Sequence, residues 1–516
     1  MKLTKKNTAL TAVFLVVMTL SAKVCGMLRD IALAGMYGTD TNQAIAFSTA
    51  SRIPLLFFDI ALGSAVTSAF IPIFNEYLEK DGRDKAIEFS NRFISLIFVV
   101  TSLMAVFGIV FSDSFINIIA GGYDEQKIVL SSQLVRILFP TIVFTGLAYC
   151  FVGILQSFGE FYIPAIISLV SNGLLIIYLV IFGDTFGVHG VAVAMLVAWA
   201  MQFVVQIPSL FKMKYKFRLD LNFKSDGIKK VCLLALPIII STWVQPINTM
   251  VNIRLASSME GGSAVPALDY ANKLYIILVG VFTFAITNLI FPSLSRAVAK
   301  GDDKEFSVIV KQALRYVMVI ITPVMIGFLL MSKPIIRLFY ERGAFDVNST
   351  ELTSAALFCY SFGMLGFGIS EICNKAFYAM HDGKTPMRTS MVGIGINVLL
   401  SIVFVVVFDF GYKTLAVCAS IAANIIGISL VYILNRKKHI LDKTDFNFGL
   451  KIIISTALMA LSVFVTNYFV PADNKIISLF VPAIVGATVY FVCCIIFKVE
   501  ELTDVINMIK AKTRKE

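Results

Sequence analysis

The chain has 516 residues, of which 58% are hydrophobic and 15% are charged, with a formal net charge of +11. Its mean hydropathy of +0.84 excludes a soluble globular protein of this length, because apolar runs of about 20 residues, long enough to cross a bilayer, follow one another along the chain. The basic residues gather in the loops between these runs, a pattern that is typical of membrane orientation and excludes nucleic acid as the partner that explains them.

The apolar runs predict about 14 membrane-spanning helices. The spans are helical because the runs are continuous, whereas a barrel would show alternation, and open sheet edges cannot be satisfied in lipid. The first run continues into Lys23 and Arg29 without a clear cleavage site, so we expect a retained span rather than a signal peptide. The predicted spans are residues 8–38, 42–74, 86–112, 127–156, 160–183, 187–211, 228–258, 264–297, 305–331, 350–380, 385–408, 413–435, 448–470 and 475–497.

Basic residues alternate between the two sets of loops that these spans define. One set holds most of them, above all Phe211–Lys230, and the other holds few. The positive-inside rule therefore places the first set and both termini in the cytoplasm. Lys333–Asp346 is the one outer loop with several charges, which indicates a role of its own.

The chain resembles itself at an offset of about 220 residues. Phe70–Phe74 recurs as Ile290–Leu294, each followed by a charged loop. Each copy holds six spans, and an even number keeps both copies in one orientation, so the repeat is parallel. The fold class we expect is an all-α polytopic membrane protein with two six-helix repeats around a central cavity plus two extra C-terminal helices. The predicted parts are a first lobe at 1–211, a basic cytoplasmic linker at 212–230, a second lobe at 231–436, spans 13 and 14 at 437–498 and a cytoplasmic tail at 499–516.

Four cations lie inside the apolar runs, namely Lys23, Arg29, Arg52 and Lys273. A cation at the bilayer centre costs about 2.5–3.5 kcal/mol on insertion scales, and such residues usually face a bundle interior or a wet cavity. Arg52 and Lys273 occupy nearly equivalent places in the two repeats. A cavity lined in this way suits an anionic cargo, and symmetric cations could clasp a diphosphate from two sides.

Structural roles compete with this interpretation. Lys23 and Asp30 lie on nearly one helix face, with Arg29 about 100° away from Asp30, so the three charges could simply neutralise one another. Arg52 precedes Pro54, where a kink would expose backbone and open the cavity wall, but Arg52 could instead snorkel to the interface. Asp59 is either its partner or a coupling carboxylate.

Enzymatic chemistry finds little support in the residues. The chain has no GxxxxGK[ST] loop, and neither its three histidines nor its eight cysteines show catalytic or metal-ligand spacing. We therefore expect no catalytic residue, no metal and no cofactor. A polytopic glycosyltransferase, with Asp346 and Glu351 as candidate acids, and a non-transporting scaffold stay as alternatives from other classes.

Several motifs together resemble the MurJ (MviN) lipid II flippases of the multidrug/oligosaccharidyl-lipid/polysaccharide exporter superfamily. Lys23–Asp30 is similar to the family's R-x-x-G-x-x-R-D signature, with Lys for the first Arg. The other matching segments are Arg52–Pro54 for [RK]-[IL]-P, Ser68–Pro72 for Q-A-F-V-P, Tyr270–Leu274 for Y-A-[ND]-R-L, Phe339–Phe345 for L-[FY]-x-R-G-A-F, and Ala376–Ala379 with Thr385 and Pro386 for A-F-Y-A and T-P.

The resemblance implies a two-lobed transporter of the bacterial cytoplasmic membrane. Such a protein moves an undecaprenyl-diphosphate-linked glycan to the outer leaflet by alternating access, and spans 13 and 14 hold the polyprenyl tail. By position, Lys23, Arg29, Arg52 and Lys273 would contact the diphosphate and Asp30 would orient or gate them, with Asp59 as a further gating or coupling candidate. The outer-loop motif contributes Arg337, Glu341 and Arg342.

The resemblance also implies a drive by membrane potential or an ion gradient, although we identify no sodium site, and contacts with membrane lipids and the cell-wall synthesis machinery. The chain departs from the family pattern at Lys23 and Lys273, where Lys replaces Arg and a bidentate fork becomes a point charge. Alternatives within the superfamily are a flippase for another undecaprenyl-linked polysaccharide and a drug or cation antiporter. An antiporter should carry unpaired acids rather than cations in its cavity.

Overall fold

The computed structural model describes residues 5–61, 69–470 and 474–502, and every regular element among them is a helix. The chain divides into two compact units, Met1–Pro266 and Ala267–Glu516. Ser68 of the predicted Q-A-F-V-P-like motif and residues 503–516 of the predicted tail lie outside the described residues. The all-helical membrane fold predicted from the sequence is confirmed.

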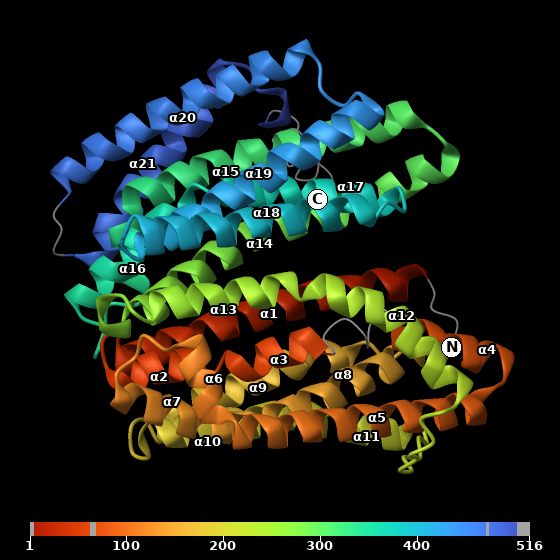
Figure 1. The fold of residues 1–516 in the computed structure, drawn as a ribbon. Helices are drawn as coiled ribbons and strands as arrows, with labels where there is room; N and C mark the ends of the chain where they lie inside the picture. Colours follow the sequence, from red (N-terminus) through yellow and green to blue (C-terminus); the bar gives the residue numbers. More distant parts are fainter. Residues whose placement is uncertain (1–4, 62–68, 471–473, 503–516) are drawn as a thin grey trace. The chain divides into compact units, whose positions relative to one another are not determined.

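The described residues of unit 1 form thirteen α-helices. They are α1 (Lys5–Tyr37), α2 (Asn42–Ala50), α3 (Ile53–Ala61), α4 (Ile71–Lys80), α5 (Arg83–Val110), α6 (Ser112–Ile119), α7 (Glu125–Leu138), α8 (Thr141–Ser157), α9 (Tyr162–Ile181), α10 (Gly187–Val204), α11 (Ile207–Lys212), α12 (Asp226–Thr242) and α13 (Val244–Ala256). In this unit α1 packs along α9 and α9 along α10, while α5 packs on α4 and α8 (Figure 1).

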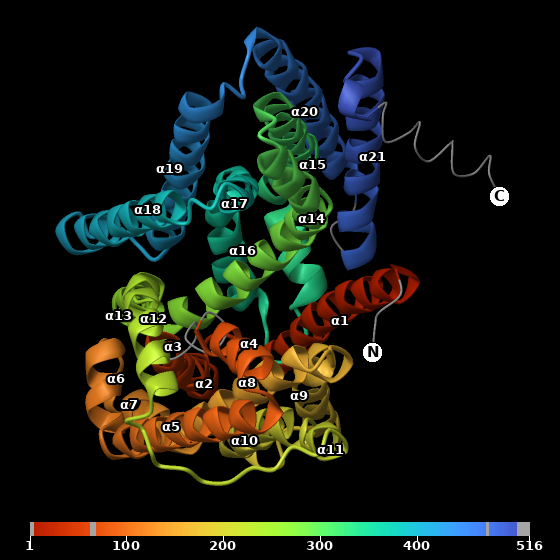
Figure 2. The ribbon, with the colours of Figure 1, turned by 90° about the vertical axis from the view of Figure 1, so that its right-hand side faces the viewer.

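Unit 2 holds the remaining long helices. They are α14 (Ala264–Lys300), which begins at the end of unit 1, α15 (Asp303–Phe339), α16 (Val347–Ser361), α17 (Met364–Ala379), α18 (Lys384–Ile402), the π-helix η3 (Val403–Val407), α19 (Lys413–Lys438), α20 (Lys443–Phe469) and α21 (Lys475–Ile496). In unit 2, α18 and α19 lie side by side, as do α20 and α21, which also pack on α15 (Figure 2).

Aromatic rings and glycines set the helix spacing inside each unit. In unit 1, Phe70 stacks on Phe93 with 4.5 Å between ring centroids. In unit 2 the backbones of α17 and α19 touch, because a Cβ on Gly366 would lie 2.5 Å from the Cα of Asn424, and a Cβ on Gly427 would lie 2.7 Å from the Gly366 carbonyl oxygen. Small residues are the usual means by which membrane helices approach closely.

Ten described helices are long and apolar enough to cross a membrane, or eleven if the bent pair α16 and α17, which meet at 49°, counts as one span. These eleven correspond to eleven of the predicted spans. The first, second and seventh predicted spans each include residues outside the described set or with undescribed side chains. The count of fourteen therefore stays a prediction.

The second and seventh predicted spans are not single helices, contrary to the sequence-based expectation. The chain breaks at Ser51 and Arg52 between α2 and α3, and again at Trp243 between α12 and α13. A proline follows each break, Pro54 and Pro246, and proline cannot supply the N–H that would continue the preceding helix. The break at Arg52 confirms the kink that Pro54 predicts.

The compact units divide later in the chain than the predicted lobes. Helices α12 and α13, which the sequence assigns to the second lobe, pack against α3, α5 and α6 of unit 1. The predicted domain boundaries themselves stay a prediction.

Candidate functional site

Arg29 is held in a polar cluster inside unit 1. Its Nε and Nη2 atoms donate to Asp30 Oδ1 at 3.0 and 2.7 Å, and its Nη1 atom donates to Asn172 Oδ1 of α9 at 2.8 Å. The indole ring of Trp199 on α10 lies 6.0 Å from the guanidinium carbon. The Arg29 and Asp30 side chains are 18% and 6% exposed, so this is a largely buried ion pair in the middle of an apolar helix.

This pairing corrects one sequence-based expectation. The helical wheel places Arg29 about 100° from Asp30, yet the long arginine side chain folds back and bonds its neighbour. Mutual neutralisation, one of the alternatives above, is thus part of the structure. It does not exclude anion binding, because a guanidinium has five N–H donors and the bonds to Asp30 and Asn172 use three of them.

The other predicted residues of unit 1 lie on α1 and around the α2–α3 break. Lys23 is half-buried on α1, two turns before Asp30. Arg52 is half-buried at the break. Close by, the buried Tyr123 hydroxyl lies 2.6 Å from Thr49 Oγ1. Asp59 is exposed on α3 and makes no ion pair within the described part of the chain. Of the two alternatives for Asp59, the pair with Arg52 is therefore not formed, and the role as a coupling carboxylate stays a prediction.

In unit 2 the predicted cation Lys273 is also paired with a carboxylate. Lys273 Nζ lies 3.1 Å from Asp269 Oδ2, one turn earlier on α14, and the Asp269 side chain is only 6% exposed. The Tyr270 ring centroid lies 5.8 Å from the ammonium nitrogen. The sequence-based prediction missed Asp269, although its i, i+4 spacing from Lys273 is the signal that could have found it.

The predicted outer-loop motif packs beside this pair. The rings of Tyr340 and Phe345 are each 1% exposed, and they lie 5.1 and 6.1 Å from the Tyr270 ring. Arg342 donates to the Leu338 and Phe339 carbonyls and so caps the end of α15. The outer-loop motif therefore has a structural link to the helix turn that carries Lys273.

Glu341 joins this loop to the start of α21. Its carboxylate accepts hydrogen bonds from Arg337 Nε at 3.2 Å and Thr350 Oγ1 at 3.0 Å, and it lies 3.2 Å from Lys475 Nζ. Burial pushes the pKa of Glu341 upward, but these hydrogen bonds and the Lys475 charge outweigh it, so the pKa is below its usual range. Of the predicted outer-loop residues, Arg337 and Glu341 thus contact each other.

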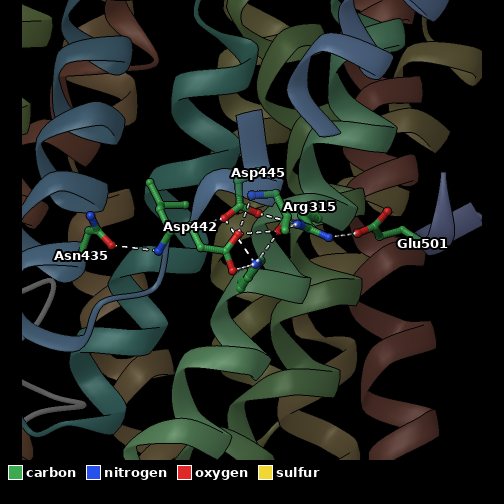
Figure 3. A network of polar contacts seen from close by, with 8 residues as sticks. Arg315, Asn435, Asp442, Asp445 and Glu501 are labelled. Carbon is green, nitrogen blue, oxygen red and sulfur yellow. Dashed lines mark hydrogen bonds and ion pairs between the residues drawn. The ribbon is translucent and has the colours of Figure 1, made fainter. Parts of the chain in front are cut away.

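A second ionic network lies at the other end of α15 (Figure 3). Arg315 donates to Asp445 Oδ1 at 2.8 Å and to Glu501 Oε1 at 2.9 Å. Lys311 donates to Asp442 at 2.6 Å, and this bond, with those from Thr444, holds the pKa of Asp442 well below its usual range. The network ties α15 to the start of α20 and to the segment that follows α21.

The fold and its ion pairs with largely buried carboxylates define a multi-span helical membrane protein with charged groups inside its apolar helices. The structure is similar to a solved structure described as lipid II flippase MurJ in an inward closed conformation, with a TM-score of 0.81, 24% identity, and coverage of 96% of this chain and 100% of that one. It is also similar to an inward-facing multidrug resistance MATE family transporter of the MOP superfamily, with a TM-score of 0.68, 16% identity, and coverage of 81% and 94%.

The family model described as lipid II flippase MurJ matches residues 33–484, and the chain belongs to this family. A relative from Buchnera aphidicola subsp. Schizaphis graminum, named probable lipid II flippase MurJ, is 28% identical over 92% of this chain and 94% of its own length. A relative of the same name from Vibrio cholerae is 26% identical over 80% of each chain. The resemblance stated from the sequence motifs is confirmed, and the family is one of transporters rather than enzymes.

Proposed function

We propose that the protein is a lipid II flippase, which moves an undecaprenyl-diphosphate-linked glycan from the inner to the outer leaflet by alternating access. Family membership supports this reading. The observation that carries it is the pairing of a predicted cargo-binding cation with a largely buried carboxylate in each unit, Arg29 with Asp30 and Lys273 with Asp269.

The pairing suggests how the cations exist in the membrane without cargo. An unpaired buried charge costs several kcal/mol, whereas a paired one is tolerated. We infer that Asp30 and Asp269 act as counter-ions while the site is empty. A diphosphate then replaces these two carboxylates as the partner of the cations. When the cargo leaves, Asp30 and Asp269 pair with the cations again. Binding is thus an exchange of anionic partners rather than the filling of a bare cationic site.

Three of the four predicted cations differ in the geometry with which they can bind a phosphate. Arg29 keeps a guanidinium fork, which Asn172 and Trp199 hold in place, and a fork suits a phosphate bidentately. Lys23 and Lys273 supply point charges. Asp59, exposed and without an ion pair among the described residues, is the proposed coupling carboxylate.

The membrane setting completes the proposal. The protein lies in the bacterial cytoplasmic membrane with both termini inside, as the distribution of basic loops predicts. Transport is driven by membrane potential or an ion gradient, since moving one charge through the field is worth about 2.3 kcal/mol per 100 mV. The proposed partners are the lipid-linked glycan, membrane lipids and the cell-wall synthesis machinery.

Complementation of a flippase-depleted strain tests the function. We expect Arg29→Gln and Lys273→Gln to abolish growth while the variants still insert. Arg136→Gln and Lys333→Gln, which break exposed ion pairs in units 1 and 2, serve as matched controls and should support growth. Full growth with both site variants would refute the proposal. Mass spectrometry of the co-purified lipid distinguishes lipid II from another undecaprenyl-linked glycan.

A further inference from the structure

A cavity of about 760 Å³ in unit 1 has no part in the proposed transport site. It lies between the first two turns of α5 and the segment Lys214–Asp220, which follows α11. The segment belongs to the basic linker predicted from the sequence. A role in membrane orientation does not by itself require the charges of this segment to line a cavity.

The segment is fixed to α5 at two points. At one end, the buried Tyr215 hydroxyl donates to Asn91 Oδ1 at 2.8 Å and lies 2.8 Å from Ser90 Oγ. At the other end, Asp220 accepts from Arg92 Nε at 2.8 Å, and its backbone N–H donates to Ser95 Oγ at 3.0 Å. The residues between these anchors span the cavity, so its wall is formed before any ligand arrives.

The cavity carries a surplus of positive charge. Four cations line it, Arg83, Lys214, Lys216 and Arg218, together with the carboxylates Asp84, Glu88 and Asp220. Arg92 forms ion pairs with both Glu88 and Asp220, and Asp84 lies in the first turn of α5, where the helix dipole favours an acid. In the described part of the chain no carboxylate lies within 4.0 Å of Lys214, Lys216 or Arg218. These three charges suit an anion.

Apolar side chains alternate with these cations along the segment. The even-numbered positions 214, 216, 218 and 220 line the cavity. Phe217, Leu219 and Leu221 between them do not, and they are 49%, 61% and 57% exposed. A soluble anion would leave these three side chains in water, whereas a ligand with both an anionic group and hydrocarbon would cover them.

The cavity lies where the membrane spans end. The span of α5 begins at Arg83, and the span formed by α10 and α11 ends at Lys212. These positions correspond to the headgroup level of a bilayer. We propose that the cavity binds the phosphate headgroup of an anionic phospholipid, with Phe217, Leu219 and Leu221 against its acyl chains. Under the proposed orientation the lipid belongs to the cytoplasmic leaflet.

Native mass spectrometry of the full-length protein with phosphatidylglycerol or phosphatidylcholine tests this site. The variant Lys214→Gln, Lys216→Gln, Arg218→Gln should bind phosphatidylglycerol about tenfold more weakly and phosphatidylcholine unchanged. The matched control removes three charges outside the cavity, at Lys212, Lys224 and Lys229, and should bind both lipids like the wild type. A second variant, Phe217→Ser with Leu219→Ser, keeps every charge and should also weaken phosphatidylglycerol binding.

Two results would overturn the site. An equal loss in the control variant would mean that the lipid responds to overall charge, with no role for the cavity. Complete displacement of phosphatidylglycerol by millimolar inorganic phosphate would mean that the cavity takes phosphate without a lipid. If the triple-charge variant does not insert, the variant Phe217→Ser with Leu219→Ser tests the site instead. Unchanged phosphatidylglycerol binding by that variant would contradict the proposed acyl-chain contacts. None of these outcomes depends on transport activity.

Discussion

Replacing Asp269 by Asn should strengthen binding of the cargo's diphosphate. Two unit charges about 4 Å apart attract by about 4 kcal/mol at an effective dielectric constant of about 20. Lys273 is 35% exposed in its pair with Asp269, so solvent screening and side-chain entropy reduce the net coupling to about 1 kcal/mol. An incoming diphosphate must overcome this coupling. Asp269→Asn removes it, and the affinity should rise about fivefold.

The assay is a double-mutant cycle on the binding of undecaprenyl diphosphate to the purified protein. Asp269→Asn should bind more tightly, Lys273→Gln should bind more weakly, and the two effects should not add, because the proposed effect of Asp269 on the cargo depends on its competition for Lys273. Tighter binding should also slow release and therefore turnover. If Asp269→Asn weakens binding, or if the two effects add, Asp269 is not a counter-ion that competes with the cargo and the exchange of anionic partners is refuted.

Three further substitutions test other contacts. Asn172→Ala removes the hydrogen bond to Arg29 Nη1, and a hydrogen bond to a charged group is worth about 1.5–3 kcal/mol. The variant should therefore bind undecaprenyl diphosphate at least tenfold more weakly at unchanged expression. Unchanged affinity would exclude a role of Asn172 in positioning Arg29. Glu341→Gln leaves Lys475 and Arg337 facing a neutral amide and should lower the free energy of unfolding in detergent by about 1–3 kcal/mol, whereas Lys333→Gln, an exposed pair, should change it little. Hydrogen bonds from Lys437 and Thr385 lower the pKa of Asp382 to about 2. Because the folded-state pKa is depressed, its stabilisation is present above the unfolded pKa of about 3.9 and is lost as the pH falls toward 2. Asp382→Asn should thus reduce the melting temperature by a constant amount above about pH 4, and a difference that persists at pH 2 would contradict this.

How much the sequence predicts depends on how local the contact is. The break at Arg52 follows from Pro54 two residues later, and the i, i+4 spacing of Asp269 and Lys273 is a pattern from which their pair can be predicted. Asn172 could not be predicted, because 143 residues separate it from Arg29 and an asparagine in an apolar run gives no sign of its partner. The sequence leaves the Arg29 pair with Asp30 open as one alternative, and a helical wheel separates the two side chains because it ignores the reach of an arginine side chain.

The two ionic networks at the ends of α15 connect the predicted lipid-tail helices to the cation of unit 2. Arg315 binds the start of α20 and Glu501 after α21 at one end, and Glu341 binds Lys475 at the other. Between them the Tyr490 hydroxyl of α21 donates to the Val319 carbonyl at 2.8 Å. α15 has 37 residues and kinks at Met331, so these contacts attach the pair α20 and α21 to α15 on both sides of the kink. Because contacts lie on both sides of this kink, we expect α15, α20 and α21 to move together. Tyr340, directly after α15, packs on Tyr270, close to the turn that carries Asp269 and Lys273. We therefore expect a movement of the helices proposed to hold the polyprenyl tail to reach this turn, and the proposed binding of the tail and of the diphosphate to be coupled within this unit.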